Sequence, residues 1–87
     1  MEAKFLSKEK DVVEVQFEGM DEGLANVIVE KLLEEKGVSM ASVNLVHPLI
    51  PTPVILVHGS DAKKELIVAL EKTASELKKT LKEAEKL

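Results

Sequence analysis

The sequence predicts an α+β fold, a two-layer sandwich with two helices on one face of a four-stranded, mainly antiparallel sheet. Residues 13–17 alternate between apolar and polar side chains, the period-two pattern of a strand with one wet face. Residues 54–58 are apolar on both faces, as in a strand covered from both sides. Residues 61–87 carry apolar side chains at helical spacing without Gly or Pro. The simplest layered arrangement follows the order strand, strand, helix, strand, strand, helix.

The first two strands are predicted as an antiparallel pair. The second is the alternating segment 13–17, and the first is the segment 3–7, which carries Phe5 and Leu6. The polar residues 8–11 connect them, although they contain no Asn-Gly or Asp-Gly turn signal. The pairing is therefore inferred from the strand patterns and not from the turn.

The first helix is predicted to run from a cap at Asp21 to about Lys36. Gly19 ends the preceding strand, and the Asp21 carboxylate can accept a hydrogen bond from the first free amides. Gly37 is expected to close the helix in a left-handed conformation. Gly23 weakens the first turn by about 1 kcal/mol relative to alanine. The residues that recur on one side are Leu24, Val27, Ile28, Lys31, Leu32 and Glu35.

The other half of the sheet is predicted from residues 38–47 and 54–58. In the first of these strands Ala41, Val43 and Leu45 share one face. Three prolines make residues 48–53 a turn that cannot continue a ladder of strand hydrogen bonds. Gly59 ends the fourth strand, and Ser60 or Asp61 caps the last helix.

The last helix is longer than the sheet that it covers. Its 27 residues span roughly 40 Å, whereas a strand of about seven residues spans roughly 23 Å. Leu77, Leu81 and Leu87 therefore overhang, although burying one leucine is worth about 1.5–3 kcal/mol. Either the helix end is frayed and partly exposed, or another chain covers it. The apolar stripe consists of Leu66, Leu70, Ala74, Leu77, Leu81, Ala84 and Leu87.

Composition excludes several classes of protein. The 87 residues suffice for one domain, and without cysteine there is no disulfide scaffold, thiolate metal site or catalytic thiol. A net charge of −4, with Phe5 and Phe17 as the only aromatic residues, argues against direct nucleic-acid binding. The N-terminus has no long apolar run, so we expect neither a secretory signal nor a membrane span. We therefore expect a soluble, cytoplasmic protein.

No constellation of residues predicts catalysis. His47 and His58 are the only histidines, each at a predicted strand end, and their spacing does not indicate a metal site. The glycine-rich phosphate loops are absent, and no serine lies in a nucleophile-elbow sequence. We therefore expect no catalytic residue, no cofactor and no metal, and no enzyme acting alone.

Two segments carry a resemblance: GMDEGLANVIVEKL, residues 19–32, and GVSMASVNLVHPLI, residues 37–50. They resemble the small alpha-like subunits of multisubunit RNA polymerases, which include archaeal subunit L and the eleventh subunit of eukaryotic polymerase II. That family carries an acidic residue, then a His-Thr-Leu-Gly-Asn box that opens its first helix, and later an alanine-containing strand that ends in His-Pro-Leu. The box's His, Thr and Gly are replaced in this chain by Glu22, Gly23 and Ala25. The matching residues are Asp21, Leu24, Asn26, Ala41, His47, Pro48 and Leu49.

The resemblance implies that residues 1–87 form one alpha-like dimerisation domain. It implies a non-catalytic assembly subunit that forms a heterodimer with the large alpha-like subunit, named D in archaeal polymerases, to nucleate assembly of a DNA-directed RNA polymerase. Subunits N and P and the larger subunits are further expected partners. A homodimeric α+β module that binds a small ligand between sheet and helices is the alternative. The residues expected at the dimer interface are Leu24, Asn26, Val27, Ile28, Leu66, Leu70, Leu77 and Leu81.

Overall fold

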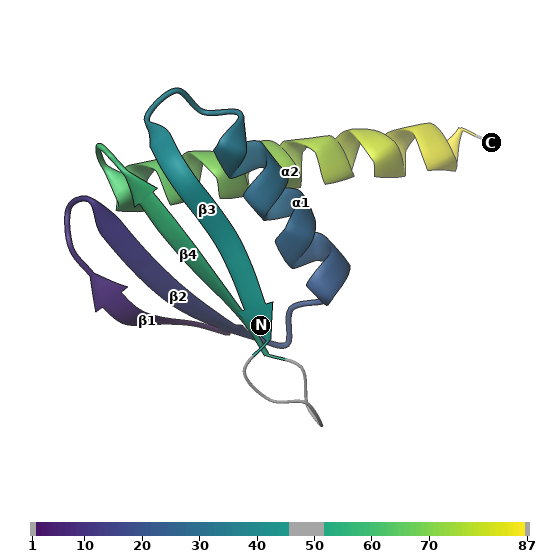
Figure 1. Ribbon diagram of the computed structural model, residues 1–87. Coiled ribbons are helices and arrows are strands. Elements are labelled where there is room, and N and C mark those ends of the chain that lie inside the picture. Colours follow the sequence, from purple (N-terminus) through teal and green to yellow (C-terminus); the bar gives the residue numbers. More distant parts are fainter. Residues whose placement is uncertain (1, 46–51, 87) are drawn as a thin grey trace.

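The computed structural model describes residues 2–45 and 52–86, and it confirms the predicted fold class and order of elements (Figure 1). The four strands form one sheet in the order β1-β2-β4-β3, in which all neighbours are antiparallel. The elements are β1 (Glu2–Lys8), β2 (Val12–Glu18), α1 (Glu22–Leu33), β3 (Val38–Leu45), β4 (Pro53–Gly59) and α2 (Ala62–Glu85).

Both helices lie on one face of the sheet and build the core there. Helix α1 packs over β3 and β4, and α2 packs over β4 and β2. Val13 lies opposite Val57, and Val15 lies opposite Ile55, so these buried side chains share the face under the helices. The core consists of Val13, Val15, Phe17, Met20, Ala25, Ile28, Leu32, Ile55, Val57, Ala62, Leu66 and Ala69.

Strand β4 is central in the sheet and is apolar on both faces, of which one lies under the helices. It pairs with β2 on one side and with β3 on the other. Val54 is buried and Leu56 half-buried on the face away from the helices. Pro53 opens the strand opposite Leu45, so the prediction that residues 48–53 lie wholly outside the ladder was wrong. A proline is tolerated as the first residue of a strand.

Helix α1 begins as predicted and ends earlier than predicted. Oδ2 of Asp21 accepts a hydrogen bond from the Gly23 amide at 2.9 Å. The helix ends at Leu33, and the right-handed Glu34 caps it, so the predicted end at Lys36 was wrong. The predicted left-handed Gly37 was wrong as well, because Gly19 alone among the described residues has a positive φ, of 82°.

Gly37 does not cap the helix but belongs, with Gly59, to a cluster where space is tight. We call this cluster the glycine corner, and it consists of Gly37, Gly59, Asp61 and Glu65. A Cβ atom on either glycine would collide with the Glu65 carboxylate. Oε1 of Glu65 accepts a hydrogen bond from the Asp61 amide at 3.0 Å, and the Ser60 amide donates to the Gly37 carbonyl at 3.0 Å. The corner therefore joins the start of β3 and the end of β4 to the first turn of α2.

A second carboxylate near this corner, that of Glu35, is poorly solvated. Its Oε2 atom is buried, without a hydrogen-bond partner in the described part of the chain. Burial raises the pKa of Glu35, and the charge of Glu65 raises it further, while Lys72 opposes both. Because this pKa is higher in the folded than in the unfolded chain, the ionised carboxylate destabilises the fold. Protonated Glu35 leaves the fold at its full stability below the pKa that this carboxyl group has in the unfolded chain. That stability is lost as pH rises through the higher pKa that Glu35 has in the folded chain.

Replacing Glu35→Gln is therefore expected to raise the melting temperature at pH 7 but not near pH 3, where the carboxyl group is largely protonated and uncharged. Thermal unfolding followed by circular dichroism at the two pH values measures the difference. The exposed neighbour provides a matched control, Glu34→Gln, which removes the same charge. An equal change in melting temperature at both pH values would contradict this explanation.

Candidate protein–protein interface

An apolar groove with a volume of about 180 Å³ runs between α1 and α2. One wall comes from α1 and the residue before its cap, and the other comes from the middle of α2. The single polar residue in the lining, Thr73, donates its hydroxyl to the Ala69 carbonyl of its own helix at 2.9 Å. The lining of the groove is thus almost entirely apolar. The groove is lined by Met20, Leu24, Ile28, Leu70, Thr73, Ala74 and Leu77.

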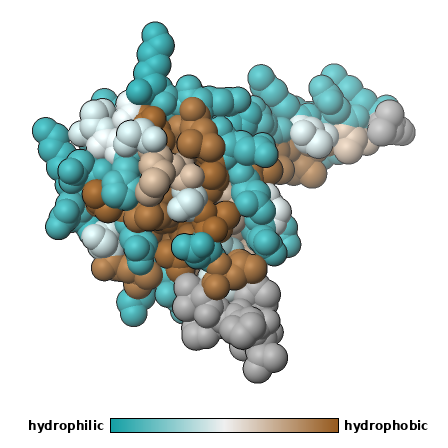
Figure 2. Space-filling model, in the orientation of Figure 1, coloured by the Kyte–Doolittle hydropathy of each residue, from teal (hydrophilic) through white to brown (hydrophobic). Residues whose placement is uncertain are grey.

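Helix α2 continues past this groove and projects from the body of the molecule (Figure 1). We call this projecting part, which carries Leu77 and Leu81, the rod. The 24 residues of α2 span about 36 Å, against about 23 Å for a seven-residue strand. Thr73 is its last buried residue; Leu77 is 51% exposed and Leu81 63% exposed. Figure 2 shows apolar atoms on the lower side of the rod, next to the body of the molecule. The predicted overhang is confirmed for these two leucines, and Leu87 lies outside the described residues.

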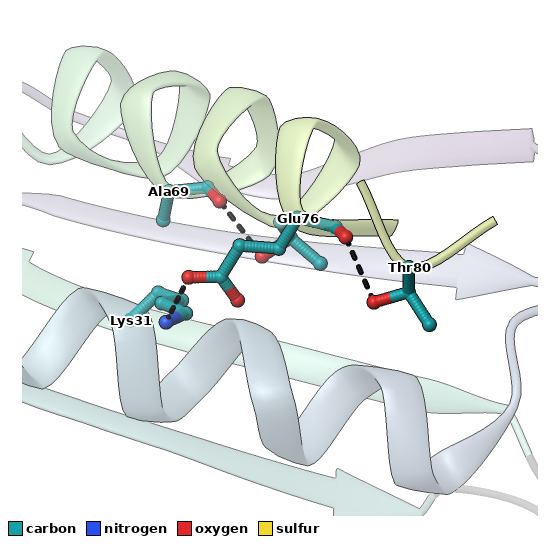
Figure 3. Close-up of polar contacts among 5 residues, drawn as sticks. Lys31, Ala69, Glu76 and Thr80 are labelled. Atoms are coloured by element: carbon teal, nitrogen blue, oxygen red, sulfur yellow. Dashed lines mark hydrogen bonds and ion pairs between the residues drawn. The ribbon is translucent and has the colours of Figure 1, made fainter. Parts of the chain in front are cut away.

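One ion pair ties the two helices together. Nζ of Lys31 on α1 lies 2.6 Å from Oε1 of Glu76 on α2, and this hydrogen bond raises the pKa of Lys31 (Figure 3). One turn further along α2, the Thr80 hydroxyl donates to the Glu76 carbonyl at 3.0 Å. These polar side chains of α2 are thus engaged with α1 or with their own helix, while the leucines remain uncovered.

Four of the eight residues predicted at an interface line the groove. They are Leu24 and Ile28 on α1, and Leu70 and Leu77 on α2. Ile28 is 1% exposed and forms the floor of the groove, whereas Leu24 and Leu70 are half-buried and form its sides. The structure thus brings together residues that lie far apart in the sequence.

The other four lie elsewhere. Val27 is partly exposed on α1, and Leu81 lies on the rod one turn beyond Leu77. Asn26 is exposed on α1 and does not line the groove. Leu66 is buried in the chain's own core and offers a partner no surface.

Four residues of the family motif are described, and one of them, Asn26, is exposed on α1. Asp21 caps α1, and Leu24 lines the groove. Ala41 lies opposite Val57 in the sheet and packs against the core. The remaining matches, His47, Pro48 and Leu49, fall outside the described residues.

Sequence reasoning missed Met20 and Thr73, both of which line the groove. Met20 directly precedes the cap of α1, and an apolar residue at that position often packs onto the first turn. Thr73 follows Leu70 by three residues, so it lies on the same side of the helix. Helical spacing identifies Thr73 only when polar residues are counted together with the apolar ones.

The described chain offers no sign of a metal centre or a membrane span. Within residues 2–45 and 52–86, no group of three or more His, Asp or Glu side chains could hold a metal ion. No helix in those ranges is long and apolar enough to cross a bilayer. His58 lies half-buried in β4, opposite Val12 and Met40.

The groove and the rod lie in a part of the chain that matches a known family. Residues 12–87 match the family described as the RNA polymerase Rpb3/Rpb11 dimerisation domain. The chain belongs to this family. The match contains the complete groove and all of α2, and it begins after β1.

Individual relatives agree with the family match. The chain is similar to DNA-directed RNA polymerase subunit Rpo11 of Sulfolobus acidocaldarius, with 38% identity over 74 residues that cover 82% of each chain. It is 36% identical over 89 residues to the Rpo11 subunit of Methanococcus maripaludis strain C6, covering 90% of this chain and 93% of that one. The crystal structure of DNA-directed RNA polymerase subunit L from Thermoplasma acidophilum shares the fold. It has a TM-score of 0.81 at 24% identity, over 98% of this chain and 86% of that chain.

Proposed function

We propose that this chain is a non-catalytic assembly subunit of a DNA-directed RNA polymerase in the cytoplasm. Residues 1–87 act as one dimerisation domain that pairs with the large alpha-like subunit, and the heterodimer recruits subunits N and P and the larger subunits. The observation that carries the proposal is the uncovered apolar rod beside an apolar groove, in a chain of a dimerisation-domain family.

The groove and the rod have the shape and chemistry of a helix-binding surface. A partner helix laid along α2 would cover Leu70, Leu77 and Leu81 and reach into the groove at Leu24. Full burial of an exposed leucine is worth about 1.5–3 kcal/mol, and each of these side chains would gain the share that is still exposed. Asn26 and Val27, exposed on α1, supply the rim. Leu66 and Ile28 contribute from beneath, by supporting the side chains that make the contact.

Co-expression with the large alpha-like subunit tests the proposal. A 1:1 complex that survives gel filtration is expected, with its mass measured by light scattering. The isolated chain, measured at the same concentration, is the control. If no complex forms and the chain alone is a tight homodimer, the proposal is rejected in favour of the homodimeric ligand-binding module.

A further inference from the structure

The exposed apolar side of α2 extends well beyond the groove, toward the start of the helix. Six residues follow one another at spacings of four, three, four, three and four, so they lie along one side of the helix. They are Lys63, Ile67, Leu70, Ala74, Leu77 and Leu81. We call this side the α2 stripe. Ile67 is 43% exposed, and none of the six side chains is buried. The stripe is therefore continuous with the proposed interface and ends at Lys63.

At that end the stripe meets an exposed aromatic ring on β1. Phe5 lies opposite Val15 in the sheet, so it shares the face that the helices cover, but at the edge strand it remains 42% exposed. Nζ of Lys8 lies 5.2 Å from the centre of the Phe5 ring, and Nζ of Lys63 lies 5.9 Å from it. Such cation–π contacts hold both ammonium groups over one small apolar surface.

Two positive charges, those of Lys8 and Lys63, thus lie close together at this end of the stripe, in a chain whose net charge is −4. The Lys63 side chain, by hydrogen bonding and by charge repulsion, lowers the pKa of Lys8. Among residues 2–45 and 52–86 the one ion pair is Lys31 with Glu76, so no carboxylate of the described chain contacts either lysine closely. A carboxylate from outside the chain would relieve the repulsion between the two ammonium groups.

We propose that Phe5, Lys8 and Lys63 form the basic end of the dimer interface and contact an acidic segment of the large alpha-like subunit. The inference rests on the proposed function and deepens it. An apolar stripe alone lets a partner helix lie in either direction or slide along it. A charged group at one end of the stripe fixes direction and register, because the reversed partner would leave both lysines without a counter-charge.

Charge reversal tests the inference, with the large alpha-like subunit as the probe. Lys8→Glu combined with Lys63→Glu is expected to weaken its binding by about tenfold or more at low salt. The difference is expected to shrink at about 1 M salt, where the Debye length is about 3 Å. The matched control is Lys4→Glu with Lys64→Glu, which changes net charge equally at exposed positions near those of the test pair. Lys4 lies opposite Gln16, on the other face of the sheet.

The outcomes separate this inference from the proposed function. If the wild-type chain binds the large alpha-like subunit and the reversed variant binds it equally well, the inference is overturned and the proposed function stands. If the wild-type chain does not bind that subunit, the proposed function fails first. A reversed variant that keeps this binding but loses affinity for a short DNA duplex would assign the lysines to phosphate binding and overturn the inference. Circular dichroism of every variant checks that the fold is unchanged.

Discussion

Replacing Leu77→Asp and Leu81→Asp together is expected to abolish the proposed complex with the large alpha-like subunit and leave the fold intact. Both leucines are more than half exposed in the isolated chain, so its folding depends little on them. In the complex, burying the part of each side chain that is still exposed would contribute about 1–2 kcal/mol. Their joint loss, about 2–4 kcal/mol, corresponds to roughly 10- to 10³-fold in affinity. Burying the new carboxylates adds a further penalty. Gel filtration and a binding isotherm measure the loss.

A control with the same change in net charge isolates the role of the stripe. Ser75→Asp with Lys79→Gln alters two exposed positions on the opposite side of the same part of α2, and it is expected to bind like the wild-type chain. Unfolding of the leucine variant, seen by circular dichroism, would show that these leucines belong to the chain's own core. Equal loss of binding in both variants would attribute the effect to net charge.

The largest expected effect on stability comes from Gly59→Ala, at about 1–3 kcal/mol of destabilisation. The added Cβ would collide with the Glu65 carboxylate and would lie only 2.7 Å from the carbonyl oxygen of Gly37. The backbone at that point cannot move freely, because the Ser60 amide is hydrogen-bonded to the same carbonyl. Urea unfolding of the variant and of the wild-type chain gives the difference in free energy.

Gly37→Ala distinguishes the two sources of this strain. At Gly37 the nearest atoms to an added Cβ all belong to side chains, those of Glu65 and Ser60. Combining Gly37→Ala with Glu65→Ala should therefore restore much of the lost stability, whereas combining Gly59→Ala with Glu65→Ala should restore less. Equal recovery in the two double variants would mean that the Gly37 carbonyl does not limit the space at Gly59.

The glycine corner also shows why some helix boundaries escaped prediction. A glycine shortly after a helical pattern usually marks a left-handed cap, and Gly37 fits that rule. The actual reason for a glycine here is the Glu65 side chain, which belongs to another helix far along the chain. By contrast, β2 and the Asp21 cap were predictable, because their patterns depend only on near neighbours, and the cap of α2 was narrowed to Ser60 or Asp61. Asp21 and Asp61 each accept a hydrogen bond from an amide of the first turn.

The candidate interface was predictable in part for a related reason. Spacing of three and four residues revealed that α2 has an apolar stripe, but it does not say which sector faces the sheet. Leu66 and Leu70 fit the same pattern, yet the first is buried in the core and the second borders the groove. Ile67 was overlooked because it lies between them in sequence, and only the sheet beneath α2 shows that it faces outward.

The central place of β4 has a consequence for how the chain folds. In the described sheet β2 and β3 each pair with β4 and not with each other, so the early hairpin of β1 and β2 stays separate from β3 until β4 enters. The pairing of Val12 with His58 closes a long loop, a slow step entropically. During synthesis the sheet is therefore completed only as α2 begins to emerge. A half-made chain has neither rod nor groove to offer, so the proposed recruitment would be restricted to nearly finished molecules.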